Sequence, residues 1–276
     1  MLTTTVDGLW VLQVLTGIEV LAAELGLRPH LPSVETEQMA LAHPIAAELR
    51  SAGVITDNGV DETVVEWLTV LARRDVGLLL YAQIPDHSGD PERVLLARFA
   101  QWWVALERCG AVIRLSGAGT ATTEHSAGLV VNAQIDRLCD QLPAATLRPV
   151  TLDSRELTTA VRNREDLHRF LTEQQLDGEQ IRALLLAGDS HRCAQASIVA
   201  IQSGVHDAVC RSHIESGAVT IIDTPTGRML AEHLRRDGGD WMIISPGSPA
   251  NIGSAVQKML RRLPAQGDWY SYRRAV

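Results

Sequence analysis

The sequence contains no run of 18 apolar residues, and it has a single lysine, Lys258. An α-helix needs about 20 apolar residues to cross a bilayer, so we expect no membrane insertion. A P-loop requires the pattern Gly-x-x-x-x-Gly-Lys, and Lys258 does not stand in one, which excludes that class of nucleotide site. The beginning of the chain lacks the basic segment of a secretory leader, and we expect a cytoplasmic protein.

Cysteine is scarce and catalytic motifs are missing. The four cysteines are widely spaced without Cys-x-x-Cys, a pattern typical of free thiols in a reducing compartment. The nine histidines form no His-Glu-x-x-His motif, and no Gly-x-Ser-x-Gly nucleophile motif occurs. Gly117 and Gly119 resemble the start of a dinucleotide-binding loop, but Thr122 occupies the third glycine position. We therefore predict no catalytic residue, no metal and no cofactor, and we interpret Gly117–Thr123 as a loop.

The charge balance excludes one class of partner. The chain has 25 basic and 33 acidic residues and a formal net charge of −8. Proteins that bind nucleic acid through the phosphate backbone need a basic surface. We therefore expect no nucleic-acid partner.

Hydrophobic periodicity predicts a mixture of helices and strands. The predicted helices are Leu9–Leu15, Glu35–Ala52, Val60–Arg73, Ala127–Leu142, Arg164–Glu173, Gly178–Ala187 and a helix that begins at Pro249. The predicted strands are Leu2–Val6, Gly77–Ile84, Arg93–Ala100, Trp102–Glu107, Ala111–Leu115, Arg148–Leu152, Ala194–Gln202, Ala208–Glu215, Ala218–Asp223, Arg228–Leu234 and Trp241–Ser245. Because Trp102 and Trp103 are adjacent in a strand, they should face opposite sides of a sheet.

The order of these elements repeats. Val60–Pro143 and Leu176–Pro264 each contain a helix, several strands, a small-residue loop and a closing helix. The closing helices match position by position, with Val131 aligned to Ile252 and Ile135 to Val256. We predict a single α+β domain over residues 1–276, with halves of about 1–145 and 146–276 that contribute strands to one antiparallel sheet.

Several segments of the second half resemble a known family. They are Val219–Leu230, the segment from Trp241 through Ser-Pro-Gly-Ser to Pro249, the helix end at Pro264, and Gly267–Trp269. Their order and spacing over the whole chain are similar to those of the EspG family, the chaperones of mycobacterial type VII (ESX) secretion. The resemblance implies a central antiparallel sheet flanked by helical bundles, with two halves related by a quasi-twofold axis.

The resemblance also implies a function. EspG proteins bind PE–PPE heterodimers, cover the apolar tip of the PPE protein, keep the pair soluble and direct it to secretion. By analogy, client contacts would come from an early loop, from the sheet and from a helical bundle. The corresponding residues here are Asp86, His87, Ser88, Asp90 and Glu92 in the loop, Arg211, His213 and Glu215 in the sheet, and Glu173, Gln174 and Gln175 at a helix end.

Two other functions remain open from the residues alone. One is an enzyme that acts on a small ligand at His87, His213 or Glu215. The other is a structural or regulatory subunit of the secretion system whose role depends on self-association. We expect a monomer or a weak homodimer.

Overall fold

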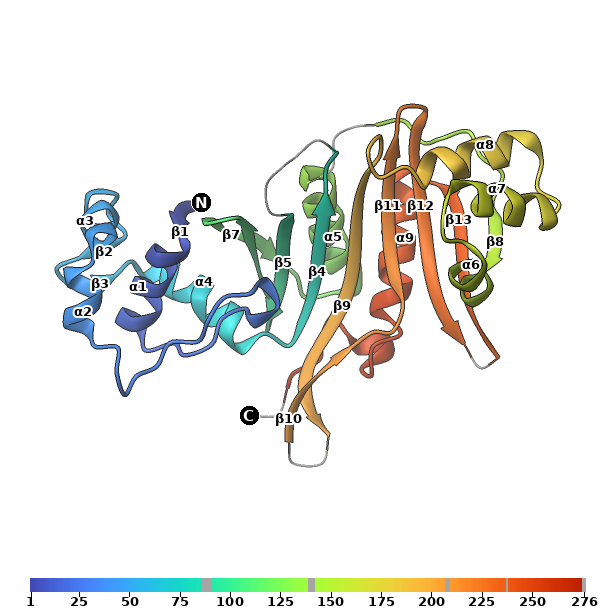
Figure 1. Cartoon of the computed structure of the whole chain (residues 1–276). Coiled ribbons are helices and arrows are strands. Elements are labelled where there is room, and N and C mark those ends of the chain that lie inside the picture. The colour runs from blue at the N-terminus through green and yellow to red at the C-terminus, as the bar shows by residue number, and fades with distance from the viewer. Residues whose placement is uncertain (86–90, 139–141, 207–208, 237, 275–276) are drawn as a thin grey trace.

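The computed structural model describes residues 1–85, 91–138, 142–206, 209–236 and 238–274 and arranges them around one 11-stranded sheet (Figure 1). The first half contributes β1 (Leu2–Thr5), β4 (Val76–Gln83), β5 (Glu92–Phe99), β6 (Trp102–Cys109) and β7 (Val112–Thr120). The second half contributes β8 (Val150–Asp153), β9 (Ala194–His206), β10 (Val209–Ile214), β11 (Ala218–Thr224), β12 (Gly227–Arg236) and β13 (Gly239–Pro246). A separate hairpin pairs β2 (Ile55–Thr56) with β3 (Gly59–Val60).

The large sheet is antiparallel, as predicted, and the two halves meet at its centre. Its strand order is β1-β7-β6-β5-β4-β9-β11-β12-β13-β8, with β10 paired to β9 outside this path. Strands β4 and β9 pair antiparallel along their length, with Val76 opposite Gln202 and Gln83 opposite Gln195. Backbone hydrogen bonds between β4 and β9 therefore join the halves directly.

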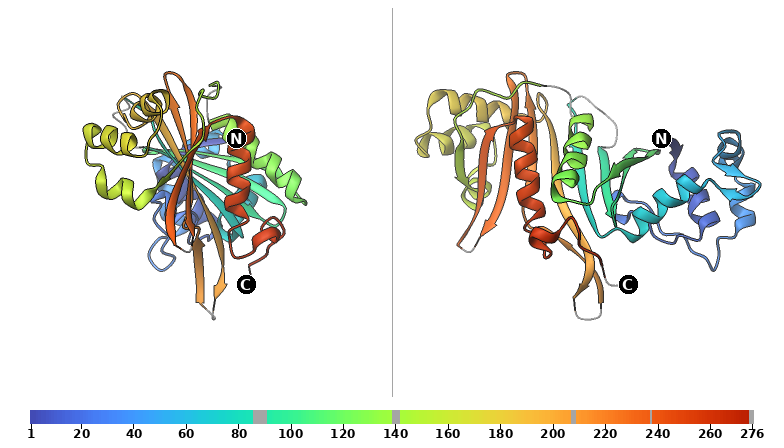
Figure 2. Two further views of the ribbon diagram at one scale, coloured as in Figure 1. Left: turned by 90° about the vertical axis from the view of Figure 1, so that its right-hand side faces the viewer. Right: turned by 180° about the vertical axis from the view of Figure 1, so that it is seen from behind.

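Helices cover both faces of the sheet, but they are placed differently on each. On one face, α5 (Glu124–Leu138) and α9 (Pro249–Leu260) lie side by side behind the central strands (Figures 1 and 2). The other helices lie toward the two ends of the sheet: α1 (Val6–Thr16), η1 (Ala23–Leu25), α2 (Glu37–Ala42), α3 (Pro44–Ser51) and α4 (Glu62–Arg73) in the first half, and α6 (Ser154–Ala160), α7 (Arg164–Glu173) and α8 (Gly178–Ala187) in the second. A short turn, η2 (Gln266–Asp268), follows α9.

None of the described helices is both long enough and apolar enough to cross a lipid bilayer.

Side chains alternate between the two faces of the sheet and so divide the core into separate clusters. Leu78 and Leu80 of β4 pack with Ile198 and Ala200 of β9 in the cluster under α5 and α9. Leu95 of β5 points the other way, into the cluster formed by the helices of the first half. A third cluster lies under α7 and α8. The matched residues of α5 and α9 named above, Val131 with Ile252 and Ile135 with Val256, are all buried in the cluster that α5 and α9 share.

Helices α8 and α9 begin where the sequence predicts, whereas α4 begins two residues later than predicted, at Glu62. The Asp61 side chain accepts a hydrogen bond from the Val64 N–H, 3.2 Å away, at the beginning of α4. Asp177 caps α8 in a reciprocal arrangement with Gln180, and Ser248 caps α9. These bonds satisfy N–H groups that have no partner in the first helical turn. Helices α7 and α8 have the predicted bounds.

The prediction of one helix over Glu35–Ala52 is wrong, because the chain forms α2 and α3 with a break at His43. Pro44 has no N–H and cannot continue a helix from the preceding turn, but it suits the first position of a new one. His43 is accordingly extended, with φ −69° and ψ 138°, and its ring accepts a hydrogen bond from the Ile45 N–H. The region after Ala22 contains the 3-10 turn η1, which the hydrophobic pattern does not indicate.

The prediction of a loop over Gly117–Thr123 is wrong for its first part, because β7 continues to Thr120. Trp102 of β6 lies opposite Thr120, and Trp103 lies opposite Gly119. Backbone hydrogen bonds form this pairing and require no particular side chain, so the small residues did not reveal it. The two tryptophans do face opposite sides: Trp103 is 1% exposed and Trp102 is 49% exposed.

Candidate partner-binding surface

The central strands have one face without a helix over it. Tyr81 and Leu79 of β4 alternate with the residues buried under α5 and α9, so they point to the opposite face. Across the strand pair, Tyr81 lies opposite Ser197 and Leu79 opposite Val199. The front of β4 and the neighbouring part of β9 in Figure 1 carries no helix, and the Tyr81 side chain is 44% exposed. We call the Leu79, Tyr81, Ser197 and Val199 surface the open central face.

The open central face combines apolar and polar groups. The Arg93 guanidinium of β5 lies 5.9 Å from the centre of the Tyr81 ring, a cation–π arrangement. The hydroxyl groups of Ser197 and Thr220 are hydrogen-bonded at 3.2 Å. Exposed aromatic and aliphatic groups beside satisfied polar groups are typical of reversible protein interfaces.

Of the loop residues predicted from the sequence, the structure describes Glu92, which stands near one end of β4. Glu92 begins β5 and pairs with Ala82 of β4. Asp86, His87, Ser88 and Asp90 lie outside the described residues.

The predicted sheet residues lie near the other end of β4, and the register places His213 on the same side of the sheet as Val76, which is buried under α5 and α9 and not part of the open central face. His213 and Arg211 belong to β10, where His213 lies opposite Gln202 of β9 and Arg211 opposite Gly204. Gln202 in turn lies opposite Val76, the first residue of β4, so the length of β4 separates His213 from the loop end. At about 3.3 Å per residue this separation is roughly 25 Å. His213 is exposed and neighbours Ile214, which is 60% exposed.

Glu215 differs from its predicted companions because it is buried. Its Oε1 accepts a hydrogen bond from Arg262 Nε, 2.9 Å away, and another from the Gly217 N–H. The Glu215 backbone N–H donates to the Ala200 carbonyl. Its carboxylate thus joins β10 to the end of α9, whereas the His213 side chain remains exposed.

The predicted helical residues form an exposed end of the second-half helical bundle. Glu173 is the last residue of α7, and Gln174 and Gln175 follow it; all three are exposed. Gln175 adopts a left-handed φ of 57°, and its N–H donates to the Thr172 carbonyl. Buried Phe170 holds this helix end against the core. The three predicted groups therefore border the sheet from separate directions and do not form one cluster.

The described residues do not assemble a catalytic site from the remaining candidates. No group of three or more His, Cys, Asp or Glu side chains in the described ranges could hold a metal ion. A cavity of about 700 Å³ lies between α4 and the β6–β7 pair and has no histidine in its lining. Burial lowers the pKa of His233 and raises that of the Cys193 thiol, whose Sγ donates to the Leu186 carbonyl. These shifts arise from packing and not from a shared reactive centre.

Sequence reasoning missed the open central face itself. Tyr81, Arg93 and Val199 were not selected, because a single exposed residue in a strand carries no signal of its own. The alternation of β4, with Leu78 and Leu80 facing one way and Tyr81 the other, is the pattern that identifies the exposed side. Only the pairing of β4 with β9 shows that the exposed side of β4 lies next to the exposed side of β9.

Comparison with known proteins assigns the chain to a family. A model of the EspG family matches residues 5–258. The ESX-2 secretion-associated protein EspG2 of Mycobacterium tuberculosis, strains CDC 1551 and H37Rv, is 49% identical over 278 residues, which cover 100% of both chains. The ESX-5 secretion-associated protein EspG5 of strain H37Rv is 27% identical over 297 residues, which cover 99% of this chain and 97% of the relative.

A solved structure confirms the fold. It is the structure of the M. tuberculosis type VII secretion system chaperone EspG5 in complex with the PE25–PPE41 dimer, and its EspG5 chain is 24% identical to this one. The two chains superpose with a TM-score of 0.75 over 96% of this chain and 97% of the other. The chain therefore belongs to the EspG family of ESX secretion-associated proteins, a family of chaperones and not of enzymes.

Proposed function

We propose that this chain is a cytoplasmic chaperone of an ESX secretion system and that its client is a PE–PPE heterodimer. The observation that carries the proposal is the 49% identity to EspG2 across both complete chains. The more distant relative EspG5 has been solved in complex with the PE25–PPE41 dimer, and the same fold extends over 96% of this chain. The greater similarity to EspG2 favours a client of ESX-2 type over one of ESX-5 type.

The open central face is the proposed centre of the client contact. A PPE tip with exposed apolar side chains would aggregate unless another protein covered it. Tyr81 offers a large, partly exposed ring near the middle of the sheet, and the Arg93 guanidinium lies beside this ring. Aromatic residues in the middle of an interface commonly carry much of the binding energy.

The residues predicted from the sequence would form the rim of this contact. Glu92 with the preceding loop residues Asp86, His87, Ser88 and Asp90 would border it at one end. Arg211 and His213 would contribute beyond its other end, where His213 lies on the α9 side of the sheet. Glu173, Gln174 and Gln175 would contribute from α7. Polar rim residues discriminate between partners more than they add affinity, which suits a chaperone that must select its own clients. Glu215 would act indirectly, by fixing the end of β10 against Arg262.

We also propose that residues 1–145 and 146–276 are halves of one domain related by a quasi-twofold axis between β4 and β9. The strand order supports this proposal: outward from the centre it is β4, β5, β6, β7 and β1 on one side, and β9, β11, β12, β13 and β8 on the other. On each side the outermost strand is the first of its half and leads directly into a helix, α1 or α6. The neighbouring helices α5 and α9 occupy equivalent places near this axis.

Coexpression with candidate clients tests the proposed function. The chain would be produced with PE–PPE pairs of ESX-2 type and, separately, with pairs of ESX-5 type. We expect comigration in size-exclusion chromatography and a higher yield of dissolved client with at least one ESX-2-type pair. Failure with every pair of both types would refute the chaperone function. A mass that rises with protein concentration in the absence of client would instead favour the self-associating subunit.

A further inference from the structure

Strand β7 has a free edge where its outer neighbour ends. The edge strand β1 pairs only with residues 112–115 of β7, with Leu2 opposite Leu115. In the rest of β7, Ser116–Thr120, pairing with described strands is confined to β6. Gly117, Gly119 and Thr120 are exposed, and no backbone hydrogen bond from another described element reaches this edge. An edge of this kind offers N–H and C=O groups to an additional strand.

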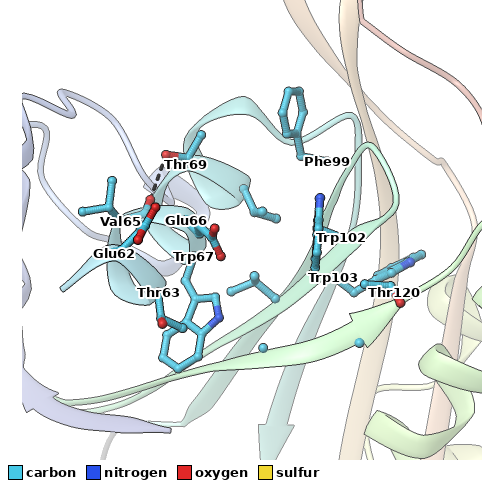
Figure 3. Close-up of a pocket in the computed structure, with 14 residues that line it drawn as sticks. Glu62, Thr63, Val65, Glu66, Trp67, Thr69, Phe99, Trp102, Trp103 and Thr120 are labelled. Atoms are coloured by element: carbon cyan, nitrogen blue, oxygen red, sulfur yellow. Dashed lines mark hydrogen bonds between the residues drawn. The ribbon is translucent and has the colours of Figure 1, made fainter.

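A groove lies directly beside this edge. Its volume is about 700 Å³, and it is bounded by α4 on one side and by β6 and β7 on the other (Figure 3). Trp67 of α4, Trp102 of β6 and Phe99 form its apolar walls. Gly117 lines the groove close to Trp67, since a Cβ at this position would lie 3.1 Å from the indole Nε1. The glycine thus leaves the strand backbone accessible next to aromatic surface.

The rim of the groove carries unpaired negative charge. Glu62 and Glu66 lie one helical turn apart on α4, and both line the groove and are exposed. Neither carboxylate forms an ion pair with any residue in the described part of the chain. Two like charges four residues apart on a helix repel each other, and a cationic side chain placed between them would remove that repulsion.

We propose that Ser116–Thr120 and this groove form a second docking site, which binds an extended segment of a partner protein as an added β-strand. The segment places a large apolar side chain against Trp67 and Trp102. It places an Arg or Lys two positions further along the same face, near Glu62 and Glu66. Side chains of a strand alternate, so these two groups can both face the groove. Three strand spacings, roughly 14 Å, separate β7 from the open central face at β4, so the two sites use different strands of the sheet.

Synthetic peptides test the site on the full chain. The probe is an octapeptide of threonine alternating with leucine and arginine, blocked at both ends. One comparison peptide has glutamate in place of arginine, and a second has N-methylated backbone amides on alternate residues. Amide hydrogen exchange would report protection of Ser116–Thr120, and tryptophan fluorescence would report contact with the groove. We expect protection only with the leucine–arginine peptide. The glutamate peptide lacks the positive charge that would face Glu62 and Glu66, and the N-methylated peptide lacks the backbone N–H donors of an added strand.

Variants add a second readout. Glu62→Gln with Glu66→Gln should weaken binding of the leucine–arginine peptide about tenfold, and Trp102→Ala should weaken it similarly. Glu48→Gln, an exposed carboxylate on α3, is the matched control and should leave binding unchanged. Equal binding of all three peptides, or protection at another strand, would overturn the proposal. Protection of Ser116–Thr120 that rises with protein concentration and without peptide would show that a second copy occupies the edge, and would also overturn it.

Discussion

The Asp75 carboxylate accepts a hydrogen bond of 2.9 Å from the backbone N–H of Arg274, which lies 199 residues further along the chain. Asp75 directly precedes β4 and is fully buried. Beside it, the buried guanidinium of Arg98 donates to the carbonyl oxygens of Tyr270 and Tyr272. The carboxylate and the guanidinium together hold the segment after α9 against the central strands.

We predict that Asp75→Asn destabilises the protein by about 3 kcal/mol, because it leaves Arg98 buried without a compensating charge. Burial already lowers the pKa of Arg98 to about 10, although Asp75, which lies 3.8 Å away, acts in the opposite direction. Urea unfolding followed by circular dichroism measures the loss. Arg273→Gln is the control, because this side chain is 51% exposed and its removal should cost under about 1 kcal/mol. An equal loss in both variants would contradict the prediction.

Acid sensitivity should depend on Glu35. Its partial burial acts to raise the pKa, but hydrogen bonds from the Leu31 N–H, Arg28 and His30 outweigh burial and lower the pKa to about 2 from its usual 4.5. A lowered carboxyl pKa stabilises the folded state above pH 4.5, and that contribution is lost as the pH falls from about 4.5 toward 2.

We therefore predict that Glu35→Gln lowers the melting temperature at pH 7 and that the difference from the wild-type protein shrinks as the pH approaches 2. Thermal unfolding at pH 7, 4 and 3 measures this difference. A difference that stays constant over this range would show that the stabilisation does not come from ionisation of Glu35.

Client binding should depend on Tyr81. We predict that Tyr81→Glu reduces affinity for a cognate PE–PPE pair roughly thirtyfold, because it places a charge where an apolar tip would be covered. Isothermal titration calorimetry with the purified pair measures the change. Met39→Glu replaces a side chain of similar exposure, 52%, on α2 and should not alter affinity. Unchanged affinity of the Tyr81 variant would exclude the open central face as the centre of the contact.

Glu215 and His213 should behave differently although they were predicted together. Glu215→Ala removes the partner of Arg262, and we expect a loss of about 1–3 kcal/mol in the free energy of unfolding. His213→Ala removes an exposed side chain and should leave stability within about 0.5 kcal/mol of the wild-type value. Denaturant unfolding of both variants, with client affinity measured in parallel, separates a structural effect from a contact. A stable Glu215 variant with weakened client binding would contradict the indirect role given to Glu215.

The site was only partly predictable from the sequence. The exposed end of α7 at Glu173–Gln175 follows from a helix whose caps and apolar face are local features. The burial of Glu215 does not, because its partner Arg262 lies 47 residues away and on a different element. Tyr81 was missed for a related reason. Its exposure depends on which strand lies beside β4 and on which part of the sheet the helices leave uncovered.

Local chemistry in the sequence alone determined the bounds of α7 and α8, the beginning of α9 at Pro249, and the mixture of helices and antiparallel strands. Tertiary structure alone decided that β4 pairs with β9, that β7 continues through Gly117 and Gly119, and that Asp75 holds Arg274. Caps and hydrophobic periods act within a few residues, so they are visible in the chain itself. Strand pairing joins distant segments by backbone hydrogen bonds, and buried ion pairs join them by opposite charges. These groups meet only when the sheet has folded, so the sequence alone does not show which of them are partners.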